Sequence, residues 1–208
     1  MNWIKSIPAV MLLIFLQCCE KEPLDHFVTD IDGNRYKTVQ IGSLTWMAEN
    51  LKVTKDKNGN SLVSYCYSEK KDKCEEFGRL YPWDEAIRAC PEGWRLPTAE
   101  DWKSLEIELG MDPLEADTFG WRGTNQGTQL KEGGVSGFEA LLAGYKDGTV
   151  FWDGRYFDIG YYGSFWSATE YDEFYAIAYF VYVTSEKVNK QKYDKTAAFS
   201  VRCVKVNP

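Results

Sequence analysis

The chain has 208 residues, a formal net charge of −7 and an aromatic content of 15%. This length allows one good-sized hydrophobic core, and the many aromatic side chains favour a well-packed, loop-rich, mainly β domain. The acidic balance excludes a nucleic-acid-binding surface, because phosphates are recognised by basic patches and no run of basic residues is present.

The first 18 residues have the form of a signal peptide. Their apolar stretch, residues 7–16, is shorter than the ~20 apolar residues that a membrane-spanning helix needs. The sequence that follows resembles a bacterial lipobox, and Cys19 fits the lipidated position best, because it places Leu16 at −3 and the small Cys18 at −1. We therefore expect a lipid anchor on Cys19. The alternative is an ordinary secretory signal in which these cysteines are incidental.

The remaining four cysteines, at positions 66, 74, 90 and 203, indicate disulfides. An even number of cysteines in an exported protein predicts two bridges, with three possible connectivities. We favour Cys66–Cys74, which closes a short polar loop, and Cys90–Cys203, which ties the middle of the chain to its last strand. A zinc site is the rival interpretation, but no cysteine pair has C-x2-C spacing and the one histidine, His26, lies in the linker.

The N-terminal part of the domain reads as strands and turns. Asp32-Gly33-Asn34 is a tight-turn signal, and strands are predicted over residues 36–41 and 44–47. Asp30, Asp32 and Asn34 could be calcium ligands. A turn is favoured, because the glycine has the wrong offset for an EF-hand loop and no glutamate closes the pattern. The segment 56–60 is a loop by the same logic.

Two helices are predicted in the middle of the chain. The first covers Asp84–Ala89, with Ala86, Ile87 and Ala89 facing inward. The second follows a cysteine-tethered turn at Cys90–Pro97, with Thr98 as N-cap and Gly110 as its end. Its expected apolar face comprises Ala99, Trp102, Leu105 and Leu109, with Glu100, Asp101, Lys103, Glu106 and Glu108 mostly elsewhere.

Residues 111–137 are rich in glycine, threonine, aspartate and asparagine, and predict a long irregular connection. Strands then dominate the rest of the chain. The predicted strands are 138–145, 149–152, 155–159, 164–168, 175–183 and 198–204.

Several blocks of sequence carry a resemblance to a known family. They are Asp30–Gly42, Thr45–Leu51, Gly78–Trp83, Cys90–Pro97, Phe165–Glu170 and Phe199–Val204. Together they resemble, in the same order, the Fibrobacter succinogenes major paralogous domain family, over about residues 28–206. The resemblance implies an exported, often lipid-anchored bacterial domain whose molecular function is largely uncharacterised.

A more distant similarity concerns the fold. Arg95–Trp102, taken with Ser200–Val204, resembles the formylglycine-generating-enzyme branch of the C-type-lectin-like fold. This implies a compact α+β domain with few helices, twisted antiparallel sheets and long loops. The chemistry of these relatives does not carry over: after Cys90 the chain has only Cys203 rather than a late copper-binding pair, and the calcium-dependent sugar-binding motifs of lectins are absent. No cofactor or metal is expected.

Catalysis has little support in the sequence. With His26 alone, a histidine-based dyad or triad in the folded part is almost excluded. A pair of acids of the glycosidase type stays open as an alternative. The carboxylates considered for it are Asp153, Asp158, Glu170, Asp172 and Glu173.

Binding has better support. Aromatic residues are dense between positions 151 and 166, and exposed aromatic faces bind sugar rings or extended peptides well. Most of these rings are expected in the core. Tyr161 and Tyr162 are adjacent, so one of them must face outward in a strand. Trp152, Tyr161 and Tyr162 are therefore our candidate ligand-binding residues.

These inferences combine into one hypothesis. We expect a signal peptide over 1–18, a linker over 19–27 and a C-type-lectin-like domain over 28–206. The protein would be a bacterial outer-membrane lipoprotein, at the cell surface or on the periplasmic face, acting as a non-catalytic binding or adhesion module for a glycan or protein. The alternatives are a carboxylate-based hydrolase and a structural component of the envelope.

Overall fold

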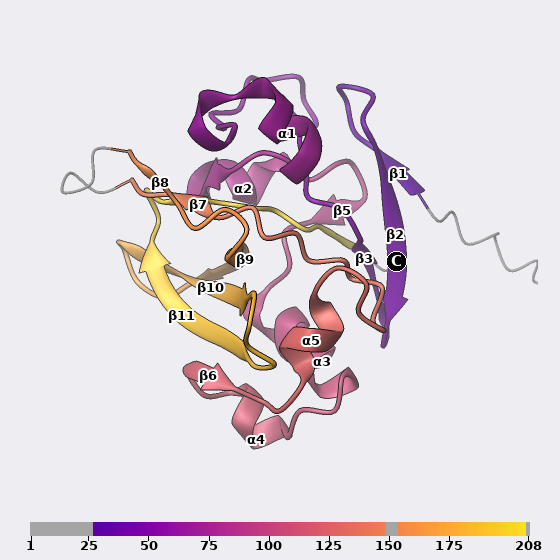
Figure 1. Cartoon of the computed structure of the whole chain (residues 1–208). Coiled ribbons are helices and arrows are strands. Elements are labelled where there is room, and N and C mark those ends of the chain that lie inside the picture. Colours follow the sequence, from indigo (N-terminus) through magenta and orange to yellow (C-terminus); the bar gives the residue numbers. More distant parts are fainter. Residues whose placement is uncertain (1–26, 149–153, 207–208) are drawn as a thin grey trace, which may run out of the picture.

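The computed structural model describes residues 27–148 and 154–206, which form three antiparallel sheets connected by short helices and long loops (Figure 1). Sheet outweighs helix, so the α+β class predicted from the sequence is confirmed. Within these two ranges no helix is long and apolar enough to cross a lipid bilayer.

The first sheet joins the two ends of the domain. Its order is β1 (Phe27–Thr29), β2 (Arg35–Ile41), β3 (Leu44–Met47), β13 (Val204–Lys205) and β5 (Trp94–Arg95). The turn between β1 and β2 is organised by Asp30, whose Oδ1 accepts hydrogen bonds from the backbone N–H groups of Asp32 and Asn34, both at 2.9 Å. Gly33 has φ +85° at this turn. The prediction of a turn at these residues is confirmed.

The second sheet contains the longest strands. Its order is β6 (Gly120–Arg122), β11 (Val188–Asp194), β10 (Tyr175–Tyr182) and β9 (Tyr162–Glu170). The third sheet is made of two-residue strands in the order β4 (Tyr81–Pro82), β12 (Ala198–Phe199), β7 (Tyr145–Lys146) and β8 (Tyr156–Phe157). β11 was not predicted from the sequence, because most of its residues are polar and those of its second half are partly exposed to solvent.

The helices agree with the predictions in the middle of the chain and differ on either side. They are η1 (Tyr67–Glu69), α1 (Lys71–Phe77), α2 (Trp83–Ala89), α3 (Ala99–Glu108), α4 (Pro113–Ala116) and α5 (Gln126–Leu130). Ile87 is 42% exposed, which corrects its predicted inward position, because Ala86 and Ala89 define the buried face of α2. The span 111–137 is less irregular than predicted: Asp112 caps α4 by accepting from the N–H groups of Leu114 and Glu115.

Strand predictions were too long in several places, and most clearly at two. Of the predicted strand 138–145, only the last residue is in a strand, and residues 198–204 form two short strands rather than one. The predicted strand 149–152 lies outside the described residues. Both overestimates come from apolar residues that are buried in loops, such as Phe138 and Val201.

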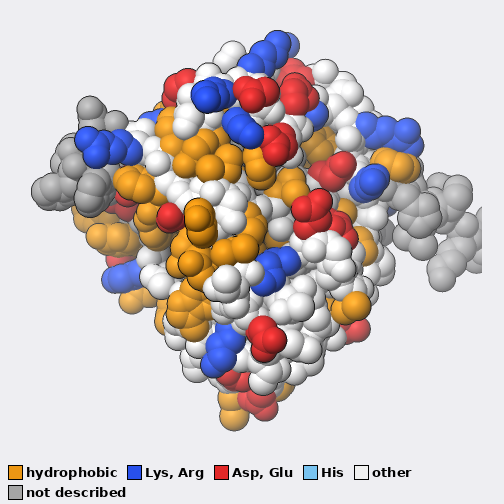
Figure 2. All heavy atoms as spheres, in the orientation of Figure 1, with side chains coloured by type: hydrophobic (Ala, Val, Ile, Leu, Met, Phe, Trp, Pro, Cys, Tyr) orange, Lys and Arg blue, Asp and Glu red, His pale blue; other side chains and the backbone are white. Residues whose placement is uncertain are grey.

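The second sheet separates two hydrophobic clusters. Trp166, Ala178 and Phe180 point into one cluster, whereas Phe165 and Tyr179 point into the other, which is covered by α3. Hydrophobic side chains also remain at the surface, and Figure 2 shows them in a band over the region where β9, β10 and β11 lie in Figure 1.

Both expected disulfides are present. Cys66 is joined to Cys74 and Cys90 to Cys203, with Cα–Cα distances of 4.9 and 5.9 Å. The polar segment between Cys66 and Cys74 was expected to be a loop. It instead forms the short 3-10 helix η1 and the first part of helix α1.

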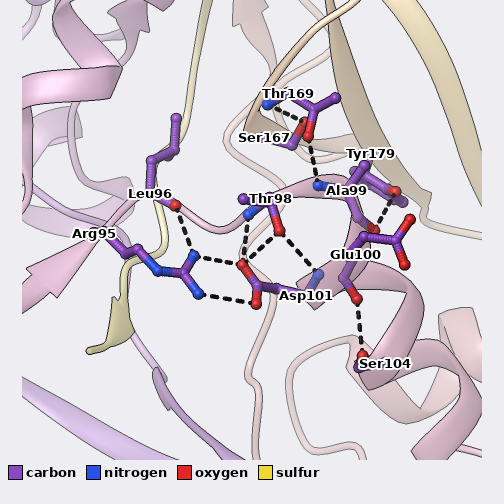
Figure 3. A network of polar contacts seen from close by, with 10 residues as sticks. All are labelled: Arg95, Leu96, Thr98, Ala99, Glu100, Asp101, Ser104, Ser167, Thr169 and Tyr179. Carbon is purple, nitrogen blue, oxygen red and sulfur yellow. Dashed lines mark hydrogen bonds and ion pairs between the residues drawn. The ribbon is translucent and has the colours of Figure 1, made fainter. Parts of the chain in front are cut away.

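The turn before α3 ends in a network of satisfied polar groups (Figure 3). Thr98 Oγ1 accepts from the N–H of Asp101, and the carboxylate of Asp101 accepts from the N–H of Thr98 at 2.6 Å, which forms a capping box. Arg95 adds two hydrogen bonds to the same carboxylate. The predicted N-cap at Thr98 is confirmed, as is the helix end at Gly110, where φ is +89°.

Glu106 of α3 differs from the prediction. It is 1% exposed rather than on the polar face, and both its oxygens accept from Arg122 of β6, at 2.6 and 2.7 Å. Periodicity within α3 could not show this, because the partner is supplied by a strand that the sequence did not predict.

Candidate ligand-binding site

The candidate site starts from one row of residues across the second sheet. Trp121 lies opposite Asn189, Asn189 opposite Phe180, and Phe180 opposite Ser164. Residues that are opposite in an antiparallel sheet share a face, so the four side chains lie on the same side of the sheet. This is the face turned away from α3.

A cavity of about 240 Å³ opens over this row. It is lined by Trp121, Tyr145, Asp158, Tyr162, Ser164, Phe180, Asn189, Gln191 and Tyr193. Most of the lining comes from the second sheet, and Tyr145 and Asp158 add a rim from the β7–β8 hairpin and the turn after it. Aromatic rings with a few convergent polar groups are typical of a small-molecule site.

The aromatic rings form two walls. On one side, Tyr145 packs edge-on against Tyr193 at 5.9 Å between ring centroids, and Tyr193 contacts Phe180 at 6.0 Å. On the other side, the ring of Tyr182 packs against those of Tyr162 and Trp121, with 4.7 and 6.4 Å between ring centroids. These contacts hold each ring in a fixed orientation before a ligand arrives.

Gly144 brings the rim against the sheet. Its N–H donates to the carbonyl of Tyr162 at 2.8 Å. Its φ is +64°, and a Cβ at this position would lie 2.2 Å from the carbonyl oxygen of Phe157. A side chain here would therefore push the β7–β8 hairpin away and widen the cavity.

Two buried polar atoms in the cavity lining have no hydrogen-bond partner. Ser164 is fully buried and Asn189 is 4% exposed, yet Ser164 Oγ and Asn189 Oδ1 make no hydrogen bond within the described structure. Leaving a buried polar group unpaired costs ~1–3 kcal/mol, so such groups are rare in stable proteins. Ser164 and Asn189 lie opposite Phe180 on its two neighbouring strands, so the two residues flank Phe180 within the row.

Burial raises the pKa of the three tyrosine hydroxyls in the cavity lining. For the Tyr162 hydroxyl, burial raises the pKa most, with smaller contributions from the neighbouring Tyr182 and then from the carboxylate of Asp158. Burial is also the largest cause of the raised pKa values of Tyr145 and Tyr193, and a hydrogen bond with Tyr145 raises the pKa of Tyr193 further, so all three hydroxyls stay protonated at neutral pH. Asp158 has φ +63°, and its carbonyl accepts from the N–H groups of Tyr161 and Tyr162.

The residues predicted from the sequence are only partly brought together here. Tyr162 lines the cavity, whereas its neighbour Tyr161 is 57% exposed and lies outside the lining. Trp152 and Cys19 fall outside the described residues. Ser164, Asn189 and Gln191 were not singled out, because a serine or an amide in a strand carries no sequence signal of its own.

Among the described acids that were considered for catalysis, only Asp158 lines the cavity. Asp153 falls outside the described residues. Glu170 pairs with Lys195, which also donates to the backbone carbonyls of Asp172 and Glu173. In the described ranges no three histidine, cysteine, aspartate or glutamate residues are grouped to hold a metal ion.

A larger hollow of about 490 Å³ lies over β2 and the loop at 132–141, and contains three glutamates. Glu49 accepts from the N–H of Lys37 at 2.7 Å, and Glu139 accepts from the N–H of Gly133 at 2.8 Å. Both carboxylates therefore hold local backbone in place.

Comparison with known proteins identifies the family. The Fibrobacter succinogenes major domain matches residues 39–205. The search of curated proteins found no match, and neither did the search of solved structures, so the C-type-lectin-like fold stays a prediction. Because the match covers most of the chain, including every element from β3 to β13, this protein belongs to the Fibrobacter succinogenes major domain family.

Proposed function

We propose that the protein is a non-catalytic glycan-binding module of the bacterial cell envelope, and that the cavity over the second sheet is its binding site. The observation that carries the proposal is an aromatic cavity whose lining residues Ser164 and Asn189 each bury a polar atom without a partner in the described structure, Ser164 Oγ and Asn189 Oδ1. A ligand hydroxyl group would supply the missing hydrogen bonds.

A sugar fits this combination of groups. The rings of Trp121, Tyr162 and Tyr193 offer flat apolar faces for the C–H face of a pyranose. Asp158, Asn189 and Gln191 offer planar polar groups for its hydroxyls. The cavity, at about 240 Å³, is smaller than a typical drug-sized pocket and suits one sugar ring.

Binding without catalysis is favoured by the carboxylates. A glycosidase of the common type needs two acids on either side of the bond to be cleaved. Asp158 is the single carboxylate among the described residues that line the cavity. Hydrolysis of a bound oligosaccharide would support the hydrolase alternative instead.

The place of the anchor is compatible with this function. In Figure 1, β1 lies at one side of the domain and β7, β8 and β11 lie at the opposite side. A lipid on Cys19 would tether the domain through β1, which leaves the cavity on the side away from the attachment point. Incorporation of labelled fatty acid that is lost in Cys19→Ala would support the anchor.

The binding proposal is tested by screening the mature protein in detergent on a glycan array, with calcium and with chelator. We expect equal binding in both arms, because the cavity supplies one carboxylate and calcium needs several oxygen ligands. Tyr162→Ala should reduce the affinity about tenfold, or about 1.4 kcal/mol. Binding that disappears in chelator would contradict the proposed site.

Tyr161→Ala is the matched control. It removes the same side chain from the adjacent position, but Tyr161 lies outside the cavity lining. We expect its affinity to match that of the unmodified protein. If both variants lose affinity equally, the cavity is not the binding site. If no glycan on the array binds, a protein ligand or a structural role is favoured.

A further inference from the structure

A second hollow lies next to the first. It has a volume of about 300 Å³ and is lined by Phe119, Gly120, Tyr171, Gln191 and Lys192. Gln191 lines both hollows. They are also linked through β6, since Gly120 borders one and Trp121 the other.

Within the described ranges, the edge of the second sheet is unpaired where the two hollows meet at Gln191. β6 ends at Gly120, opposite Lys190, so the described structure places no strand alongside β11 from Gln191 onward. Gln191, which lines both hollows, lies at this unpaired edge, so a ligand that extends from the first cavity to the second would pass over its side chain. The long amide side chain of Gln191 can donate to and accept from hydroxyl groups at this crossing.

The second hollow presents aromatic rings to solvent. Phe119 is 52% exposed and Tyr171 is 49% exposed, and their rings meet edge to face at 6.1 Å. Lys192 Nζ lies 4.6 Å from the centre of the Tyr171 ring and 5.1 Å from that of Tyr175, so the second hollow combines aromatic rings with a cationic group. Adjacent exposed aromatic rings on a monomer mark a contact surface more often than isolated apolar residues do.

We propose that the two hollows are consecutive subsites of one groove and that the natural ligand is a glycan chain of several sugar units. The end unit occupies the first cavity, the next unit crosses Gln191, and a further unit stacks on Phe119 and Tyr171. This inference rests on the proposed glycan-binding function. A single ring leaves the exposed Phe119–Tyr171 pair unused, whereas a chain covers it.

The test is a chain-length series of gluco-, manno- and galacto-oligosaccharides, from one to six units, titrated against the mature protein. In the series that binds, we expect affinity to rise at least tenfold from one unit to three or four, and then to level off. Phe119→Ala and Tyr171→Ala should remove most of this gain while leaving the affinity for the single sugar unchanged.

Phe174→Ala is the control, because Phe174 is 64% exposed in the same β9–β10 turn as Tyr171 but lines neither hollow. It should leave the length dependence intact. Equal affinity for one and six units, or a gain that survives Phe119→Ala and Tyr171→Ala, would overturn the extended groove while the first cavity stands. If no sugar of any length binds, the proposed function fails together with this inference.

Discussion

The turn before α3 and the cavity over the second sheet use their polar groups in opposite ways. At the turn, Asp101 accepts from Thr98 and from Arg95, so a carboxylate that is only 8% exposed is fully compensated. In the cavity, Ser164 and Asn189 are as deeply buried and keep atoms without a partner. Satisfied polar groups stabilise a fold, whereas unsatisfied ones cost stability.

The largest effect on the turn is expected from its disulfide. Replacing Cys90 and Cys203 by alanine opens a loop with a sequence separation of 113. Loop entropy predicts a loss of about 4–5 kcal/mol in the free energy of unfolding. The measurement is the urea midpoint under oxidising conditions.

The Cys66–Cys74 bridge provides the control for this prediction. Its sequence separation is 8, so the same reasoning predicts a loss of about 2–3 kcal/mol. If removing the short disulfide lowers the free energy of unfolding as much as removing the long one, loop entropy does not explain how the Cys90–Cys203 disulfide stabilises the turn.

Glu106 gives the next largest effect, on the dependence of stability on pH. Burial raises the pKa of Glu106 to about 7, against the opposing influence of Arg122 and the more distant Lys190. A folded-state pKa above the unfolded value means that the folded state binds more protons between about pH 4.5 and 7. Stability should therefore fall by up to about 3 kcal/mol as pH rises through this window.

Urea midpoints at pH 5 and pH 8 check this prediction. The one histidine of the chain, His26, precedes the described domain, so histidine titration in the domain does not mask the effect. Glu106→Gln should flatten the slope, because glutamine does not titrate. A slope that persists in this variant would assign the pH dependence to other groups.

The cap should respond to pH in the opposite sense. Burial opposes ionisation of Asp101, but hydrogen bonds from Arg95 and Thr98 outweigh burial and hold its pKa below the usual range. Its stabilising effect is present above pH 4 and is lost as pH falls through the lowered folded-state pKa. Asp101→Ala should cost about 2 kcal/mol at pH 7, measured by thermal unfolding.

Asp112→Ala tests whether the Arg95 contact matters. Asp112 caps α4 through two backbone N–H groups, but it is exposed and no arginine contact to it is recorded among the described residues. We expect Asp112→Ala to lower the free energy of unfolding by about 1 kcal/mol or less, which is a smaller loss than that of Asp101→Ala. Equal losses would show that the bidentate contact of Arg95 contributes little.

The same contrast explains what could be predicted from the sequence. The cap at Thr98, the end at Gly110 and the turn at Asp30 follow from local chemistry within a few residues, and all are confirmed. The cavity depends on the register of four strands, which places Ser164 and Asn189 on either side of Phe180 although they are far apart in the chain. Tyr162, which lines the cavity, could be singled out because aromatic density is visible in the sequence, whereas strand register is not.

The smallest expected change in stability belongs to Ser164→Ala, and its sign is opposite to the others. Removing a buried hydroxyl that has no partner removes a desolvation cost, so stability should stay unchanged or rise by up to about 1 kcal/mol. Affinity for the glycan found on the array should nevertheless fall several-fold, because the ligand loses a hydrogen bond.

Ser167→Ala is the matched comparison, because Ser167 is equally buried in the same strand but donates to the carbonyl of Ile177 at 2.8 Å. It should destabilise the fold by about 1 kcal/mol and leave affinity unchanged, because Ser167 lies outside the cavity lining. The two serines thus differ in whether the protein itself satisfies the hydroxyl and in whether the residue lines the cavity. If Ser164→Ala destabilises the fold as much as Ser167→Ala and binds as before, the hydroxyl of Ser164 serves the fold and the cavity loses its main support as a site.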